Sequence, residues 1–217
     1  MSILQELLDL IYPPRCPFCR RLLRKKETPV CPDCMRSLQR VPESAQRRDL
    51  KNIELAVAPL YYEGKVRASL LRYKFRGVTA YARAYADFLQ KCIDENEISC
   101  DSITWVPLSR GRLRQRGYDQ ARLLAEEIAA AEGWPCESLL EKIRETRPQS
   151  GMGGREARRR NAAGAYRVRD NARVAGKHIL LADDIVTTGE TLQECARVLR
   201  AAGAASVCAV TAARKKE

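Results

Sequence analysis

The sequence predicts an α/β fold in which a mostly parallel sheet is covered by helices on both faces and is preceded by a small four-cysteine module. First, short apolar runs alternate with helical patterns from residue 55 onward, as in sheets of parallel strands. Second, the run at 179–182 is apolar without alternation, which is typical of a strand buried on both faces. Third, two Cys-x-x-Cys pairs precede residue 35, and 217 residues suffice for one domain plus an appendage.

The first part of the chain predicts a short helix and a linker. Residues 1–11 place four apolar residues at helical spacing, and two prolines at 13 and 14 end this helix. Residues 42–52 are polar and charged without a period, which predicts a linker. We therefore divide the chain into an N-terminal helix with the four-cysteine module (1–41), the linker (42–52) and the α/β domain (53–217).

The α/β domain is predicted to alternate strands and helices. Val, Leu and Tyr favour the first strand, while Pro107 stops the second and Gly133 and Gly203 end helices. The predicted strands are 55–62, 103–106, 177–182 and 206–211, with a further short apolar run at 139–143. The predicted helices are 66–73 and 81–93, hinged at Gly77, then 119–131, and one with the buried stripe Leu192, Cys195, Ala196 and Leu199. Residues 144–165, rich in Arg and Gly without an apolar stripe, predict a long mobile loop.

The composition indicates a basic, non-membrane protein. A formal net charge of +12 attracts polyanions such as phosphate-rich small molecules or nucleic acid, although a solvated basic surface explains it equally well. Charges interrupt every apolar run before the roughly 20 residues that a bilayer requires. With no secretory leader either, we expect no membrane span and a cytoplasmic location.

The four grouped cysteines predict a structural zinc ion. Cys16, Cys19, Cys31 and Cys34 form two knuckles that present four thiolates to one tetrahedral ion, with no open position for a substrate. A module of about 25 residues has too little core to fold unaided, so the metal would supply its folding energy. Redox and iron–sulfur chemistry are the alternatives. The basic turn at 20–26 is either a nucleic-acid contact or a solvated turn.

The segment after the strand at 177–182 predicts a binding site for ribose and phosphate. Ligands of open α/β sheets bind beyond the carboxyl ends of the strands, where Asp183 and Asp184 follow. Two adjacent carboxylates can accept hydrogen bonds from two ribose hydroxyls. The turn at 187–191 offers small side chains, hydroxyls, a glycine and the backbone N–H groups of a helix start, which suit a phosphate dianion.

Other interpretations of this segment have less support. An N-capped helix after an acidic strand end needs only one Ser, Thr or Asp, and the segment supplies a whole series. The chain has neither a Walker loop nor Gly-x-Gly-x-x-Gly. His178 is the only histidine and starts a strand, so we interpret it as a packing or edge residue, and hydrolase chemistry with a Ser/His/Asp set has no support.

Residues 178–192 resemble the signature of the type I phosphoribosyltransferases, which consists of an apolar strand, two acidic residues, an apolar pair and Thr-Thr-Gly-x-Thr. Further motifs narrow the resemblance to the ComF family, competence-associated proteins with an N-terminal zinc module. These motifs are the paired Cys-Pro-x-Cys, residues 73–77, 106–108, 116–120 and 146–149, and Arg159 with Asn161, Ala165 and Tyr166. The resemblance covers nearly the entire chain.

The resemblance implies a type I phosphoribosyltransferase-like sheet and a set of site residues. Asp183 and Asp184 would bind the ribose hydroxyls of phosphoribosyl pyrophosphate. The 5-phosphate would be bound by Thr187, Thr188, Gly189, Glu190 and Thr191, and the pyrophosphate loop would contain Leu108, Ser109 and Arg110. Lys74 and Arg76 would belong to a hood over the acceptor, formed by about 53–98, and the mobile loop would close over the reaction. Magnesium would bridge pyrophosphate and ribose oxygens, since it prefers hard oxygen ligands.

Two groups of arginines flank this predicted site. One alternates along 110–116, and the other crowds the mobile loop with Arg155, Arg158, Arg159 and Arg160. They would capture pyrophosphate while the loop excludes water, since the planar guanidinium suits phosphate oxygens. Alternatively they line a groove for single-stranded nucleic acid, with Tyr118 or Tyr166 stacking on bases, or form a flexible cationic surface.

The leading functional hypothesis is a magnesium-dependent phosphoribosyltransferase-like protein that binds phosphoribosyl pyrophosphate, with an enzymatic activity favoured and an acceptor that the sequence does not identify. The ComF resemblance also implies a link to DNA uptake in natural transformation. The alternative is a non-enzymatic cytoplasmic factor that binds single-stranded DNA, acts with DNA-uptake proteins and keeps the nucleotide-binding fold. The oligomeric state is left open.

Overall fold

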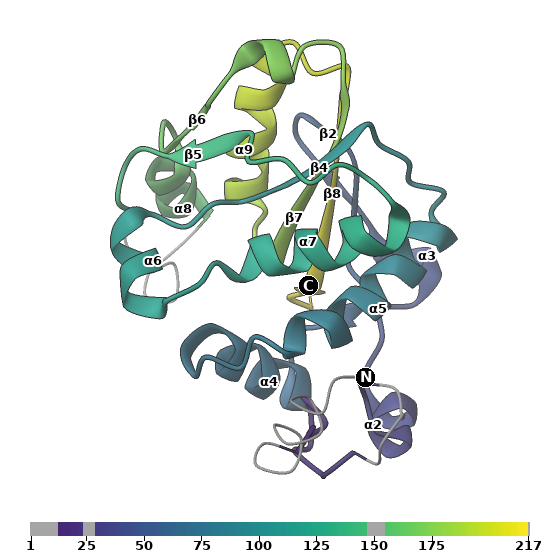
Figure 1. Cartoon of the computed structure of the whole chain (residues 1–217). Helices are drawn as coiled ribbons and strands as arrows, with labels where there is room; N and C mark the ends of the chain where they lie inside the picture. Colours follow the sequence, from purple (N-terminus) through teal and green to yellow (C-terminus); the bar gives the residue numbers. More distant parts are fainter. Residues whose placement is uncertain (1–12, 24–28, 147–154, 217) are drawn as a thin grey trace.

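A computed structural model describes residues 13–23, 29–146 and 155–216, and a six-stranded sheet lies at the centre of this part of the chain (Figure 1). The strand order is β1-β2-β8-β7-β4, and β3 also pairs with β8. The bounds are β1 Arg47–Leu50, β2 Ile53–Val57, β3 Leu60–Tyr61, β4 Ser102–Trp105, β7 His178–Val186 and β8 Ser206–Arg214. All pairs are parallel except β1 with β2. The prediction of a mostly parallel sheet is confirmed.

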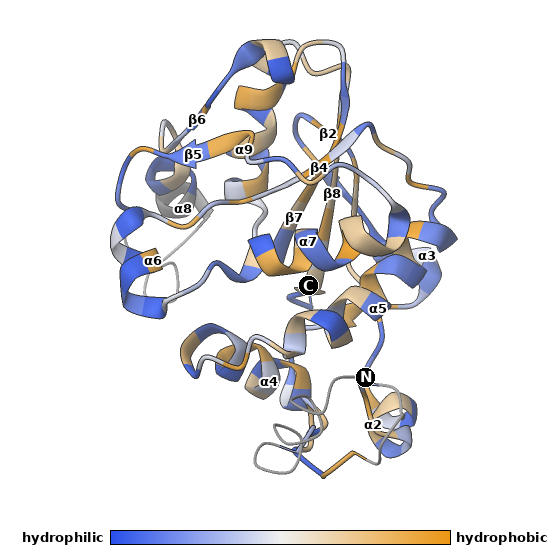
Figure 2. Ribbon diagram, viewed as in Figure 1, coloured by the Kyte–Doolittle hydropathy of each residue, from blue (hydrophilic) through white to orange (hydrophobic). Residues whose placement is uncertain are grey.

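Helices cover both faces of the sheet. On one face, α5 (Tyr81–Glu95) and α7 (Gln120–Glu132) contact each other and strands β7 and β8. On the other face lies α9 (Glu190–Ala201), beside a small antiparallel pair formed by β5 (Leu140–Lys142) and β6 (Tyr166–Val168). The two apolar clusters of the core accordingly lie on opposite sides of the central strands, and the helices turn their apolar surfaces toward the sheet (Figure 2).

The predicted helices form where the sequence places their ends. Helix α4 spans Gly64–Phe75, and Gly77 separates it from α5 with a φ of +67°. The α7 helix begins after Asp119, whose carboxylate accepts a hydrogen bond from the Arg122 N–H, and ends at Gly133 in the left-handed region. The structure also contains α6 (Arg110–Arg116) and the 3-10 turn η2 (Asn171–Arg173), neither of which was predicted.

The segment predicted as a linker, 42–52, contains regular secondary structure that the sequence did not predict. This segment forms α3 (Glu43–Gln46) and the edge strand β1, which pairs with β2. Leu50 is buried in the core, and the Gln46 side chain accepts a hydrogen bond from the Asn96 amide at 2.8 Å. An edge strand of four residues needs only one or two buried side chains. Such a strand can therefore be mostly polar, and the alternation of apolar and polar residues that predicts a strand is absent.

Three further boundaries differ from the predictions. The strand predicted at 177–182 continues as β7 through both aspartates to Val186, because β8 offers it paired residues as far as Arg214. The strand predicted at 55–62 is interrupted at Pro59 and becomes β2 and β3. The segment predicted as a loop at 144–165 contains α8 (Arg155–Ala162). The predicted helix at 1–11 and residues 147–154 lie outside the described residues.

The cysteine module packs directly against the domain. Its helix α2 (Pro32–Ser37) lies near α4 and α5, at the end of the molecule toward which the C-terminal ends of β7 and β8 point (Figure 1). The Phe18 ring contacts the rings of Tyr85 and Phe88 edge-on, with centroids 5.7 and 6.1 Å apart. In the described part of the chain, no helix is long and apolar enough to cross a membrane.

Candidate functional site

The two aspartates of the signature lie near the C-terminal end of β7 and point to opposite faces of the sheet. Side chains alternate along a strand. Asp184 therefore shares the face of Leu180 and Ala182, which is covered by α5 and α7, and Asp183 shares the face of Leu181, toward α9. The sequence interpretation treated them as equivalent because it ended the strand before them.

The two carboxyl groups have different surroundings. Burial, together with the negative charge of Asp184, raises the pKa of Asp183 to about 8, against the opposing effect of Lys74. One Asp183 carboxylate oxygen also accepts the Asp184 backbone N–H at 2.8 Å. Below about pH 8 the free protein thus holds a proton on Asp183, whereas the Asp184 carboxylate lies against the Lys74 ammonium group.

Lys74 forms the main ion pair of the site. Its Nζ lies 2.8 Å from Asp184 Oδ1, and the two side chains are only 20% and 11% exposed. Lys74 lies on helix α4, which belongs to the segment 53–98 that the family resemblance assigned to the hood. Because the pair is largely shielded from water, the ammonium group compensates a carboxylate that would otherwise be buried without a partner.

The turn between β7 and α9 has the geometry expected of a phosphate loop. Gly189 has a φ of +80° and is the N-cap residue of α9. Because glycine has no side chain, no side-chain hydrogen bond from the N-cap satisfies the first N–H groups of the helix. The Thr188 hydroxyl is buried and has no hydrogen-bond partner. A helix start without a capping side chain and an unsatisfied hydroxyl beside it together favour an anion as the missing partner.

The edge strand β1 and the turn after it form hydrogen bonds with this loop and with α9. The sequence did not predict these contacts. The Arg48 guanidinium donates a hydrogen bond to the Thr187 carbonyl oxygen at 2.6 Å, and the Lys51 N–H donates to Gln193 Oε1 at 3.1 Å. Leu50 packs so closely that a Cβ atom on Gly189 would lie 2.5 Å from its Cδ2. No local pattern could have revealed these contacts, since Arg48 and Thr187 are 139 residues apart.

The predicted pyrophosphate loop follows β4 and is tied to its surroundings. The Leu108 N–H donates to Asp119 Oδ2 at 2.8 Å, and the Ser109 hydroxyl donates to Glu145 Oε2 at 2.7 Å. Ser109 also caps α6, whereas Arg110 is exposed. The loop therefore connects α7 with the start of the segment predicted to be mobile.

A lysine that the sequence interpretation did not single out lies near Asp183. Lys142, on β5, is over the Tyr166 ring with its Nζ 5.0 Å from the centroid. Burial, together with the positive charge of Arg112, lowers its pKa to about 8. Arg112 in turn donates to the Thr146 carbonyl at 2.6 Å. This corner of the site holds cationic groups on the α9 side of the sheet, next to Asp183.

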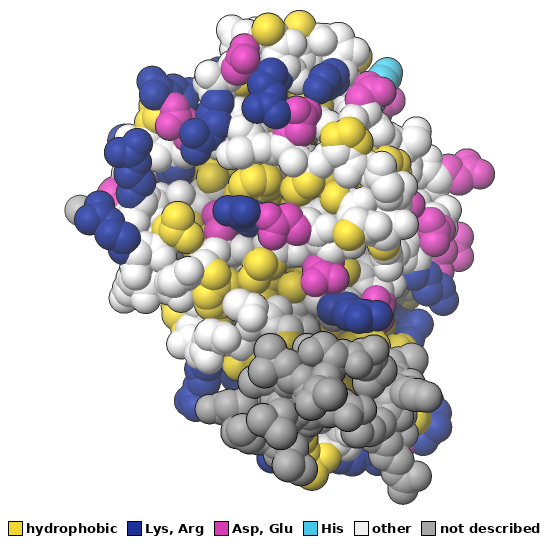
Figure 3. All heavy atoms as spheres, viewed as in Figure 1, with side chains coloured by type: hydrophobic (Ala, Val, Ile, Leu, Met, Phe, Trp, Pro, Cys, Tyr) yellow, Lys and Arg dark blue, Asp and Glu magenta, His cyan; other side chains and the backbone are white. Residues whose placement is uncertain are grey.

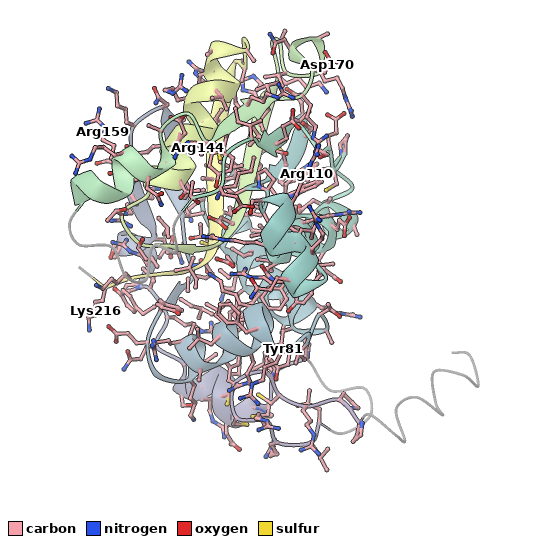
Figure 4. The ribbon with its side chains drawn as sticks, turned by 90° about the vertical axis from the view of Figure 1, so that its left-hand side faces the viewer. Tyr81, Arg110, Arg144, Arg159, Asp170 and Lys216 are labelled. Carbon is pink, nitrogen blue, oxygen red and sulfur yellow. The ribbon has the colours of Figure 1, made fainter. Side chains whose placement is uncertain are left out.

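The helices that carry the two groups of arginines, α6 and α8, lie on one side of the molecule (Figure 1). Figure 3 shows Lys and Arg side chains gathered over α6, β5 and β6, and Figure 4 shows Arg110, Arg144 and Arg159 on the same side. Arg159 and Arg160 are exposed, whereas the side chains of Arg155 and Arg158 lie outside the described residues. Arg144 has a structural role, because it donates to the carbonyls of Asn161 and Ala163 at the end of α8 at 3.0 and 2.6 Å.

Neither tyrosine named for base stacking in the alternative interpretation is fully exposed. Tyr166 is buried under Lys142, and the half-buried Tyr118 ring donates its hydroxyl to the Tyr73 carbonyl. Among the described residues, the ring of Phe75 is exposed: it is 64% accessible and has the Arg116 guanidinium 4.8 Å from its centroid. His178 contacts Ser206 at 2.8 Å at the other end of β7, which confirms it as an edge residue.

The four cysteine sulfurs have the spacing of a zinc site. All lie within 4.8 Å of one another, and the Cys19 and Cys31 sulfurs are 3.5 Å apart. Tetrahedral zinc with bonds of about 2.3 Å requires sulfur separations of about 3.8 Å. Although burial raises the pKa of Cys16, backbone N–H groups of Cys19, Cys31 and Phe18 lower it to about 7, which favours the thiolate that zinc binds.

Comparisons with known families match both parts of the chain. A model of the phosphoribosyl transferase domain matches residues 117–217, and a model of the double zinc ribbon domain matches residues 7–46. Together they show a phosphoribosyltransferase-type α/β fold with an N-terminal four-cysteine zinc ribbon, as the sequence predicted.

The relatives are proteins of competence and DNA utilization. The DNA utilization protein YhgH of Salmonella typhi is 37% identical over 49% of this chain and 46% of its own length, so the chain spans about half of that relative. The competence protein ComFC of Bacillus subtilis is 28% identical over 92% of this chain and 77% of its own length. Among solved structures, the glutamine phosphoribosylpyrophosphate amidotransferase of B. subtilis aligns at 22% identity over 65% of this chain and 30% of that chain, with a TM-score of 0.45.

Proposed function

The chain is a homologue of the ComF-type competence proteins, and we propose that it binds phosphoribosyl pyrophosphate with Mg²⁺ at the C-terminal edge of the sheet. The observation that carries this proposal is the unpartnered Thr188 hydroxyl beside the uncapped start of α9, directly after the two aspartates. The 5-phosphate would bind residues 187–191, and the ribose would lie against Asp183 and Asp184.

The Lys74–Asp184 ion pair of the free protein would have to change when the ligand binds. Lys74 neutralises Asp184, so the ribose hydroxyls and Mg²⁺ would have to displace its ammonium group from the carboxylate. Magnesium, when bound with the ligand, neutralises pyrophosphate charge and prefers oxygen ligands. On the other face of the strand, Lys142 and Arg112 would contribute positive charge toward the pyrophosphate.

The reaction that this arrangement favours is pentosyl transfer. The bond between ribose C1 and the pyrophosphate oxygen breaks with both electrons leaving on the oxygen, and a lone pair of the acceptor forms the new bond to C1. The proton of the acceptor passes to solvent. Negative charge on Asp184 stabilises the positive charge that grows on the sugar ring. The acceptor is not identified by any group of the site.

Calorimetric titration of the full chain with phosphoribosyl pyrophosphate and Mg²⁺ tests this proposal. We expect one binding site, with an affinity lowered about tenfold or more in Asp184→Asn, which corresponds to about 1.4 kcal/mol. Asp94→Asn, a change of the same charge on an exposed residue of α5, serves as the control and should bind as the wild type. Absence of binding to the wild type, or equal binding by both variants, would overturn the proposal.

A second candidate function is binding of single-stranded DNA. Its support is the net charge of +12, the arginine-rich side that carries α6, and the exposed Phe75 ring beside Arg116. Exposed aromatic rings next to cationic side chains stack on bases without sequence preference. On this account the chain would contact DNA directly in the cytoplasm and act together with DNA-uptake proteins.

Affinity for a single-stranded oligonucleotide should then fall steeply with salt, because phosphate contacts release counterions. Phe75→Ala should weaken binding by about 1–3 kcal/mol through lost stacking, while Leu22→Ala, at an exposed apolar residue of the cysteine module, should not. A flat salt response would count against this function.

A further inference from the structure

We infer that the zinc module positions Lys74 at the phosphoribosyl site through helix α4, with Arg72 as the positioning residue. The inference concerns the architecture around Asp184 and rests on the proposed function only where ligand affinity is concerned. Three consecutive residues of α4, Arg72, Tyr73 and Lys74, each form a contact with a different part of the molecule.

Arg72 connects α4 to the first cysteine knuckle. Its Nη2 donates hydrogen bonds to the carbonyl oxygens of Pro17 and Phe18, at 2.6 and 3.3 Å. These two residues lie between Cys16 and Cys19, so a metal ion bound by these cysteines would restrict the positions of their carbonyls. A charged donor to backbone carbonyls in a partly buried setting is a strong hydrogen bond.

Apolar packing reinforces the same connection. Cys16, Phe18, Cys31 and Cys34 share one apolar cluster with the α4 residues Leu70 and Tyr73 and with α5. The Phe18 ring contacts the Tyr85 ring, and Tyr85 contacts Tyr73 with centroids 6.0 Å apart. The zinc module therefore packs directly against α4. A separate domain, in contrast, would form its own core.

The other contacts of this helical turn lead into the site. The Tyr73 hydroxyl donates to the Gln120 carbonyl at the start of α7 at 2.8 Å, and Lys74 pairs with Asp184 on β7. Successive residues of a helix point about 100° apart and rise about 1.5 Å. A small rotation of α4 that breaks the Arg72 contacts therefore also moves the Lys74 ammonium group away from its carboxylate.

This geometry makes metal and ligand binding interdependent. Loss of zinc would remove the folding energy of the knuckle and with it the acceptors of Arg72, so the end of α4 would lose its contact with the cysteine module. Lys74 would then neutralise Asp184 less well, and the site would be less ordered before the ligand binds. By thermodynamic linkage, a ligand that depends on ordered α4 should in turn slow the loss of zinc.

Hydrogen exchange of the zinc-loaded and zinc-stripped full chain tests the positioning without any ligand. We expect zinc removal to accelerate amide exchange at residues 70–76 about tenfold or more, while exchange in α9, on the opposite face of the sheet, changes little. Unchanged exchange at 70–76 would overturn the inference. Equal acceleration in α4 and α9 would also overturn it, because the module would then support the whole fold instead of this helix.

A second measurement separates this inference from the proposed function. Arg72→Met should retain zinc but bind phosphoribosyl pyrophosphate about tenfold more weakly and show faster exchange at 70–76. Arg67→Met, at an exposed position of the same helix, should match the wild type in each respect.

If the wild type binds no phosphoribosyl pyrophosphate, the proposed function fails while the exchange result still decides the positioning. If Arg72→Met does not fold, Arg72→Lys, which keeps a charged donor, should give a smaller shift in the same direction, and wild-type exchange in Arg72→Lys would contradict the role of the guanidinium.

Discussion

At the scale of single residues, the site depends on side chains whose ionisation is set by their position on a strand. Asp183 and Asp184 are neighbours in sequence, yet alternation along β7 gives one the surroundings of α9 and Lys142 and the other those of α4. Their presence at the sheet edge could be predicted from the apolar run before them. The alternation could not, because the strand was predicted to end at 182, and Lys142 and Lys74 come from segments distant in sequence.

The raised pKa of Asp183 predicts how stability changes with pH. The folded protein binds the proton up to about pH 8, whereas the unfolded chain releases it near pH 4, so the wild type loses stability as pH rises between these values. Asp183→Asn removes this effect. We expect the variant to gain in melting temperature relative to the wild type from pH 5 to pH 8, and the difference to level off above about pH 8.

Thermal unfolding across that pH range, without ligand, provides the measurement. Asp170→Asn, an exposed carboxylate at the start of η2, is the control and should show no comparable trend. A constant difference between Asp183→Asn and the wild type at every pH would show that Asp183 titrates normally.

Gly189 predicts a second effect at this scale. Its positive φ disfavours any Cβ atom, and Leu50 occupies the space where that atom would lie. Gly189→Ala should therefore lower the free energy of unfolding by about 2–4 kcal/mol. Gly164→Ala has a similar φ of +65° but open space around it, and should cost only about 1 kcal/mol. Equal losses in denaturant unfolding would show that Leu50 yields without strain.

At the scale of elements, the sequence predicted the helices and strands that are long and amphipathic or fully buried. It did not predict the elements whose conformation depends on tertiary contacts. Helices α5, α7 and α9 have apolar stripes and clear ends, so their existence followed from the sequence alone. Strand β1 forms because the sheet offers it an edge. Its residue Arg48 then contacts the phosphate loop, and Lys51, in the turn after the strand, contacts α9. Nothing in a window of local sequence distinguishes such a strand from a linker.

Strand β1 should therefore matter for ligand binding. Arg48→Met removes the hydrogen bond to the Thr187 carbonyl, and we expect it to weaken binding of phosphoribosyl pyrophosphate about fivefold or more, the loss of roughly 1 kcal/mol expected for such a bond. Lys51→Met removes the same charge in the turn directly after the strand but leaves the backbone contact to Gln193 intact. Calorimetry should show wild-type affinity for Lys51→Met, and a similar loss in both variants would indicate a general effect of charge.

At the scale of the whole molecule, the zinc ribbon and the phosphoribosyltransferase-type domain share a core. The two Cys-x-x-Cys pairs identified the metal site because their spacing has few other uses. The sequence could not reveal that Phe18 and Arg72 join the module to α4 and α5, since these contacts connect residues more than fifty positions apart. The division of the chain into separate domains is accordingly still a prediction, and the shared core argues against independent units.

Metal removal should reflect this shared core. We expect one zinc ion per chain by elemental analysis, and a lower melting temperature after chelation, because the knuckles lose their folding energy and α4 and α5 lose their packing partners. Replacing the exposed Cys136 by Ser, outside the four ligands, should leave the zinc content unchanged. A zinc-free chain with unaltered melting temperature would contradict the structural role of the metal.

The most direct test of the ribose-phosphate site is an experimental structure of the chain with phosphoribosyl pyrophosphate and Mg²⁺. The account predicts the 5-phosphate at residues 187–191 with the Thr188 hydroxyl bonded to it, the ribose hydroxyls at Asp183 and Asp184, and the Lys74 ammonium group displaced from its present 2.8 Å contact. A ligand bound elsewhere, or an occupied site in which the Lys74–Asp184 pair is intact and Thr188 is still unpartnered, would contradict it.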